Sequence, residues 1–199
     1  MLTRLGRPAA PGDAVDLLLE CHVRIRAFLG MARRLAEGAA APPEELAATA
    51  ERVHRYFAQA LPLHALDEEE SILPRLRGLD PEVDRELDEM VHEHAGHGPP
   101  LEALLAACAA LAREPARHAA LAAALGDATA ELERHFAAHL AREEAVIFPA
   151  VRRLLDPAAD AAIVRELRAR RGVVEPEPAA PHATEPRARL AGARAAEGG

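Results

Sequence analysis

The stretch HALDEEESILP at residues 64–74 returns as HLAREEAVIFP at residues 139–149, with five identities in eleven positions and no gap. Both copies fit the pattern His-x3-Glu-Glu-x2-Ile-[Leu or Phe]-Pro. Residues four apart lie on the same face of an α-helix, so each copy places an imidazole and a carboxylate one turn apart. The repeat predicts two related helical segments that present the same pair of polar side chains.

A single histidine also precedes each repeat. His22 and His94 are 72 positions apart, close to the 75 positions that separate the two repeats. The chain is therefore predicted to consist of two duplicated helical hairpins, each with one single His and one His-x3-Glu segment.

Proline and glycine divide the chain into five helical stretches, and no run alternates β-branched with polar residues as a strand would. Each of the first four stretches carries an apolar stripe at helical spacing. Because short loops force consecutive helices to lie antiparallel, the pattern predicts an all-α, up-down-up-down four-helix bundle. The expected helices run from Asp13 to about Glu37, from just after Pro43 to near Pro74, after Pro81, after Pro115, and from about Pro157 to Arg171.

The expected domain organisation follows from these boundaries. Residues 1–12 form a flexible N-terminus, 13–155 the bundle, 156–171 an extra C-terminal helix, and 172–199 a tail rich in Pro, Ala, Arg and Glu. Such a composition buries too little apolar surface to fold, so we expect the tail to be disordered.

Composition narrows the possible functions. The 199 residues carry 24 basic and 32 acidic side chains, for a net charge of −8, and no lysine. Without a lysine amine the chain has neither a Walker-type phosphate loop nor a Schiff-base site, and its acidic balance argues against nucleic acid as a partner. Two distant cysteines, and no apolar segment of signal-peptide or membrane-spanning length, favour a cytoplasmic protein without a membrane partner.

The apolar stripes direct an unusual set of polar residues toward the shared core. Buried carboxylates are rare unless they are paired or bound to metal, and one metal centre would satisfy all of these groups together. The expected metal ligands are His22, His64, Glu68, His94, His139 and Glu143. No catalytic residue stands out beside them.

Six ligands exceed one tetrahedral zinc site, so we expect two ions with Glu68 and Glu143 as bridging carboxylates. Imidazole and carboxylate donors without a thiolate pair suit iron, and manganese or zinc less well. The open coordination positions would accept a diatomic molecule or peroxide. His135, one turn before His139, and His97, three residues after His94, are candidates for a seventh ligand.

One His on the first helix, His-x3-Glu on the second, one His on the third and His-x3-Glu on the fourth resemble the hemerythrin-like family, the HHE cation-binding domain. The resemblance covers about residues 13–155 and implies a non-haem di-iron centre in a four-helix bundle. It implies binding or sensing of O2, peroxide or NO, or iron handling. Oxygen-carrying hemerythrins have two His four apart on helix three, where this chain has His94 and Gly98. The arrangement is most similar to the bacterial branch with one His per helix, which includes iron-sulfur cluster repair proteins.

Two other functions remain open from the sequence. Glu51-x-x-His54 and Glu89-x-x-His92 have the Glu-x-x-His spacing of a ferritin-like di-iron oxidase or iron store, although both pairs fall off the apolar stripes. A metal-free helical interaction module would also suit the alanine-rich faces.

Some neighbouring residues have more than one interpretation. Glu69 and Glu144 are either acceptors for the imidazole N–H groups or outward-facing charges. Pro62 should kink its helix, either for packing or to widen a ligand pocket. His92 points some 200° away from His94, and the flanking Leu87, Val91 and Leu101 favour His94 as the inward residue. His118 is expected at an exposed helix start.

Overall fold

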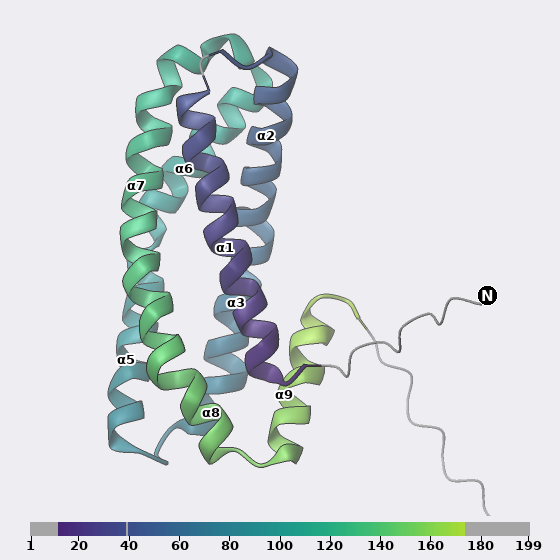
Figure 1. The fold of residues 1–199 in the computed structure, drawn as a ribbon, viewed down its shortest axis with the longest axis vertical. Helices are drawn as coiled ribbons and strands as arrows, with labels where there is room; N and C mark the ends of the chain where they lie inside the picture. Colours follow the sequence, from purple (N-terminus) through teal and green to yellow (C-terminus); the bar gives the residue numbers. More distant parts are fainter. Residues whose placement is uncertain (1–11, 39, 174–199) are drawn as a thin grey trace, which may run out of the picture.

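The structure is a computed structural model that describes residues 12–38 and 40–173. Within these residues every regular element is helical and there is no strand, so the expected all-α class is confirmed (Figure 1). Residues 1–11 and 174–199, which hold most of the expected flexible N-terminus and disordered tail, lie outside the described residues.

The helical elements group into four long rods and one shorter helix. The first rod is α1 (Ala14–Glu37). The second comprises α2 (Pro43–Arg55), η1 (Tyr56–Ala60), α3 (Leu61–Leu66), η2 (Asp67–Ile72) and α4 (Leu73–Leu76). The third comprises α5 (Pro81–Gly96) and α6 (Gly98–Arg113). The fourth comprises η3 (Pro115–Arg117), α7 (His118–Arg142), η4 (Glu143–Ile147) and α8 (Phe148–Leu154), and α9 (Pro157–Arg170) follows.

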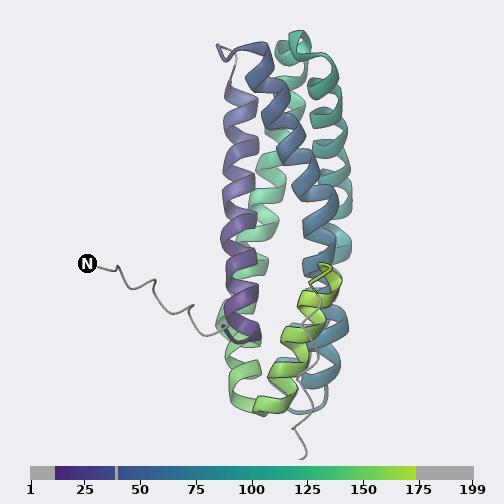
Figure 2. The ribbon, with the colours of Figure 1, turned by 90° about the vertical axis from the view of Figure 1, so that its right-hand side faces the viewer.

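The rods form an up-down-up-down bundle, as the short connections predicted. The first rod packs against the second and the fourth, and the third rod also packs against the second and the fourth. Figures 1 and 2 show the four rods running along the long axis, with α9 against the lower end. Each rod is therefore antiparallel to the rods beside it.

The first rod begins where the sequence predicted. Asp13 is the N-cap, and its carboxylate accepts a hydrogen bond of 2.7 Å from the backbone N–H of Asp16, whose own side chain bonds back to Asp13 to complete a capping box. The Asp13 carboxylate also accepts a hydrogen bond from Arg152 on α8 at 2.9 Å. The cap thus joins the start of the first rod to the end of the fourth.

Three prolines lie just after π-helical turns. Pro62, Pro74 and Pro149 have no N–H to donate, and each ring would clash with the carbonyl four residues earlier in a regular α-helix. The preceding residue donates instead to the carbonyl five positions back: Leu61 to Tyr56, Leu73 to Glu68, and Phe148 to Glu143. The proline that ends each repeated motif is thus matched by a π-turn that begins at or next to the motif's glutamate.

The third rod is interrupted at His97. Pro99 and Pro100 cannot donate to the carbonyls of Ala95 and Gly96, so the chain ends one helix at Gly96 and begins another at Gly98.

The interior consists of two apolar cores with a polar layer between them. One core, at the end of the bundle where α1 ends, is built on Ile25, Phe57, Leu104, Leu132 and Phe136. The other, at the end covered by α9, is built on Leu18, Ile72, Leu87, Ile147 and Ile163. Along each rod the six residues predicted as the main metal ligands lie where one core gives way to the other.

Either Met90 or Val91 fitted the apolar stripe of α5, and Met90 is the buried residue, whereas Val91 is 39% exposed. One expectation about a side-chain position was wrong. His118 is buried, and its Nε2 lies 2.7 Å from the carbonyl oxygen of Leu35, because the start of α7 packs against the end of α1.

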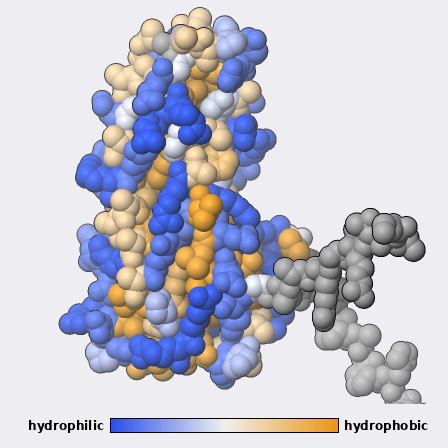
Figure 3. Space-filling model, in the orientation of Figure 1, coloured by the Kyte–Doolittle hydropathy of each residue, from blue (hydrophilic) through white to orange (hydrophobic). Residues whose placement is uncertain are grey.

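The surface mixes hydrophilic and hydrophobic residues on the face shown in Figure 3. Among the described residues, no helix combines the length and the apolar character that a bilayer crossing requires.

Candidate metal centre

The polar layer brings together the six residues that the sequence singled out as ligands. Their ligand atoms fall into two groups of four, and within each group all atoms lie within 4.8 Å of one another. The groups are His22, His64, Glu68 and Glu143, and Glu68, His94, His139 and Glu143. The two groups share both glutamates, and each has its own pair of histidines.

Each glutamate presents its two oxygens to different histidines. Glu68 Oε1 lies 3.3 Å from His64 Nε2, and Glu68 Oε2 lies 3.3 Å from His94 Nε2. Glu143 Oε2 lies 3.1 Å from His22 Nε2, and Glu143 Oε1 lies 3.1 Å from His139 Nε2. One oxygen of each carboxylate therefore belongs to each group, which is the arrangement of a carboxylate that bridges two cations.

Most of the atoms that face the centre have no hydrogen-bond partner among the described residues. The buried atoms without a partner include both oxygens of Glu68 and of Glu143, and the Nε2 atoms of His22, His64 and His139. Leaving a buried polar atom unpaired costs about 1–3 kcal/mol. Seven such atoms turned toward one small region fit a pair of cations, which would satisfy all of them at once.

Burial controls the protonation of these side chains in the protein without cations. Burial, followed by the neighbouring imidazoles, lowers the pKa of His139 to about 2 and holds the pKa of His64 well below its usual value. Burial raises the pKa of Glu143 to about 8, with Glu68 as the next cause, and raises the pKa of Glu68 well above its usual value. Burial thus disfavours both protonated imidazoles and ionised carboxylates in this layer. A divalent cation would supply the positive charge that ionised carboxylates need there.

Three of the four histidines are oriented by a carboxylate on the other ring nitrogen. His22 Nδ1 donates to Glu144 at 2.8 Å, and His94 Nδ1 donates to Glu69 at 2.7 Å. Since an ionised carboxylate only accepts, the proton lies on Nδ1 and the lone pair of Nε2 faces the centre. Of the two interpretations of Glu69 and Glu144, the structure favours the acceptors.

Glu93 plays the same part for His139, which donates from Nδ1 at 3.0 Å. Arg142 holds the other oxygen of Glu93 at 2.9 Å. Sequence reasoning assigned Glu93 no such contact, because its partner lies 46 residues away on another rod. The one available signal was its position immediately before His94.

The duplicated halves differ at His64. Its Nδ1 is buried and has no hydrogen-bond partner. In the second hairpin, Glu93 directly precedes His94 and accepts the hydrogen bond of His139. In the first hairpin, the corresponding residue before His22 is Cys21, which is half-buried. A thiol at this position replaces the carboxylate that the internal repeat would supply, so the two groups are chemically unequal.

The two further candidate ligands lie outside both groups. His97 is 6% exposed, and its ring stacks on Phe136 at 4.4 Å and lies 5.1 Å from the ring of His139. Burial lowers the pKa of His97 to about 4. His135 is half-buried, with its ring 5.8 Å from that of His97.

The Glu-x-x-His pairs of the ferritin-like alternative do not meet in the core. Glu51, Glu89 and His92 are exposed, and His54 is half-buried. None of these four residues belongs to a candidate metal-binding group among the described residues.

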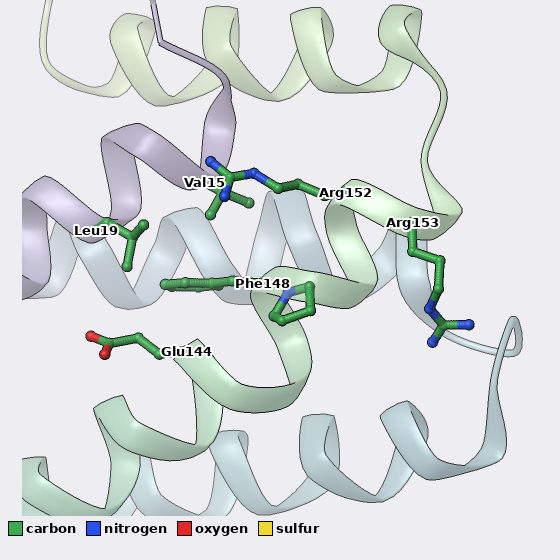
Figure 4. Close-up of a pocket in the computed structure, with 7 residues that line it drawn as sticks. Val15, Leu19, Glu144, Phe148, Arg152 and Arg153 are labelled. Carbon is green, nitrogen blue, oxygen red and sulfur yellow. The ribbon is translucent and has the colours of Figure 1, made fainter.

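A surface groove of about 450 Å³ lies close to His22, and its lining includes Glu144 and Phe148. Figure 4 shows the Glu144 carboxylate beside this groove, with Phe148 near its middle and Leu19 of α1 opposite. The ring of Phe148 lies 4.9 Å from that of His22. Glu144 and Phe148 therefore contact both the groove and the buried imidazole.

A four-helix bundle that turns four imidazoles and two carboxylates toward one level has the architecture of a cation-binding protein. The family model described as the hemerythrin HHE cation binding domain matches residues 13–151, so the chain belongs to this family. The resemblance inferred from the repeated motif is thus confirmed, and the candidate ligand groups support a cation-binding role. No curated protein matches the chain.

Proposed function

We propose that the chain is a non-haem di-iron protein that binds or senses O2, NO or peroxide, or handles iron. The observation that carries the proposal is the pair of ligand groups that share Glu68 and Glu143, with one oxygen of each carboxylate turned toward each group. Two imidazoles and two carboxylate oxygens then serve each ion.

The donor set supports iron over the other candidates. Imidazole nitrogen and carboxylate oxygen together suit iron, and manganese or zinc less specifically. His22, His64, His94 and His139, together with Glu68 and Glu143, would hold two iron ions, which would supply redox chemistry toward a small ligand.

The protein itself orients the candidate ligands and keeps bulk water away from them. Glu144, Glu69 and Glu93 fix the orientation and the tautomer of three imidazoles, so that each Nε2 lone pair is aimed before a cation arrives. The apolar cores above and below the layer keep bulk water away from the carboxylates. A cytoplasmic location, as the composition predicts, fits this proposal.

The test is metal analysis together with an absorption spectrum of protein purified in air. We expect two irons per chain and the near-ultraviolet absorption of a ferric pair. His64→Ala and His139→Ala should each abolish that spectrum, whereas His92→Ala, at an exposed position of α5, should retain it. Two zinc ions without iron, or no metal after iron loading, would contradict the proposal.

A further inference from the structure

The two ligand groups of the centre are related by the internal repeat, contact by contact. His94 Nδ1 donates to Glu69, and at the corresponding positions of the other hairpin His22 Nδ1 donates to Glu144. In each group the two imidazole rings also meet edge to face, with centroids 5.2 Å apart in one group and 4.9 Å apart in the other. A contact that is present in one group and missing from the other is therefore a real difference between them.

One contact has no counterpart. His139 Nδ1 donates to Glu93 at 3.0 Å. The corresponding imidazole, His64, is 3% exposed, and its Nδ1 is buried without a hydrogen-bond partner. The residue that corresponds to Glu93 is Cys21, and its thiol makes no hydrogen bond to His64. Of the four candidate ligand imidazoles, His64 is the one whose outer nitrogen finds no acceptor among the described residues.

The nearby arginines do not offset this difference. In one group Glu144 also accepts a hydrogen bond from Arg26 at 2.8 Å, and in the other Glu93 also pairs with Arg142 at 2.9 Å. Each group thus has one supporting carboxylate whose charge is shared with an arginine. The imbalance that remains is a second carboxylate, Glu69, in one group and none in the other.

The missing acceptor weakens His64 as a ligand in two ways. An acceptor on the outer nitrogen holds the proton there and makes the inner nitrogen a stronger donor to a cation. Without an acceptor, ligation through Nε2 of His64 requires a proton on Nδ1 that stays buried and unpaired, which is unfavourable. Loss of such a supporting contact weakens metal binding by about 10- to 100-fold.

We propose that the two cation positions differ in affinity, and that the position between His22 and His64 is the weaker, exchangeable one. The cation beside His94 and His139 binds first and is retained. The other cation binds last, and a chelator or an iron acceptor removes it first. This inference rests on the proposed function, because both ions are held by its ligand groups, and it assigns iron exchange to one of the two positions.

The experiment uses the metal-free full chain with iron(II) in the absence of oxygen. Calorimetric titration should show two binding steps, with dissociation constants at least about 10- to 100-fold apart. Because repulsion between neighbouring cations also separates the two steps, the position of the first ion decides. Crystals of the full chain with one iron per chain should give the stronger anomalous peak at the iron edge beside His94 and His139.

Cys21→Glu supplies the carboxylate that the internal repeat predicts. The guanidinium of Arg171 lies 3.8 Å from the Cys21 sulfur, so the new carboxylate has a cation beside it, as Glu93 has. The weaker position should gain about tenfold or more in affinity, and the two peaks in the one-iron crystal should become similar. Cys21→Ala is the matched control, because it removes the thiol without adding an acceptor, and it should leave the unequal peaks as they are.

Glu93→Cys is the reciprocal variant, and it keeps the test valid if Cys21→Glu does not fold. It gives the second group the same missing support as the first. The first binding step should weaken about 10- to 100-fold, and the two peaks in the one-iron crystal should again become similar.

The outcomes that overturn the inference differ from those that overturn the proposed function. Equal peaks in the one-iron crystal of the unmodified chain, or a stronger peak beside His22 and His64, would refute the inference while leaving a two-cation centre in place. The same change in Cys21→Ala as in Cys21→Glu would show that the missing carboxylate is not the cause. Failure of the unmodified chain to bind iron at either step would refute the proposed function itself.

Discussion

Glutamates take two separate roles around the centre, and the roles depend on which imidazole nitrogen each one faces. Glu68 and Glu143 face Nε2 atoms with both oxygens unpaired within the protein. Glu69, Glu93 and Glu144 each accept from an Nδ1 atom instead. The orientation of three of the candidate ligand histidines is therefore set by carboxylates that belong to neither candidate group.

Glu93→Gln tests this role at His139. An amide oxygen accepts a weaker hydrogen bond than a carboxylate and leaves the imidazole less basic, so the affinity of the protein for the cation should fall roughly 10- to 100-fold. Competition with a chelator measures this affinity. Glu89→Gln is the matched control, because Glu89 lies one turn earlier on α5, is half exposed and lies 3.5 Å from Arg142, away from the histidines of the two groups. Equal affinities for both variants would show that Glu93 does not support the site.

The sequence predicted the residues of the two groups better than it predicted their supports. His-x3-Glu spacing places both side chains on one helix face, so local periodicity sufficed for Glu68 and Glu143. The contact of Glu93 with His139 joins two rods and depends on their relative rotation, which periodicity does not give. For Glu69 and Glu144 the interpretation stayed open for the same reason.

At the scale of elements, the π-turns and α9 were less predictable than the rods. A kink was expected at Pro62, but the π-turns that precede Pro62, Pro74 and Pro149 were not, because a stripe read at 3.6 residues per turn does not reveal one inserted residue. The boundaries of α9 agree with expectation within one residue. Its attachment to η2 could not be read from the sequence.

That attachment consists of two partly exposed arginines that pair with one buried carboxylate. Asp67 is fully buried on η2, next to Glu68, and its carboxylate accepts hydrogen bonds from Arg170 at 3.0 Å and Arg171 at 2.6 Å. Arg170 also donates to the side chain of Ser71 at 2.9 Å. The end of α9 thus holds the segment that carries one of the shared glutamates.

Replacing both arginines, Arg170→Gln with Arg171→Gln, should leave the Asp67 carboxylate buried without its partners. Breaking a buried pair in this way costs on the order of 3 kcal/mol, so the free energy of unfolding should fall by about that amount in chemical denaturation. Arg165→Gln, at an exposed position of α9, is the control and should change it little. If the double variant were as stable as the control, α9 would not fasten η2.

At the scale of the whole molecule, the duplicated pattern explains why the topology was predictable. Two hairpins with the same stripe, joined by short loops, leave few arrangements other than an antiparallel bundle (Figure 1). In that bundle the four histidine-bearing stripes meet in the interior. The separation of the interior into two apolar cores follows from the same stripes. A cavity of about 170 Å³ beside His97 could not be predicted, because its volume depends on the packing of Phe136 and on the break between α5 and α6.

The central claim is that two cations share Glu68 and Glu143, each with its own pair of histidines. Anomalous diffraction at the iron absorption edge, from crystals of the iron-loaded full chain, tests it most directly. Two anomalous peaks are expected between the two carboxylates, one beside His22 and His64 and the other beside His94 and His139. A single peak, or an iron-loaded crystal with no peak among these six side chains, would contradict it.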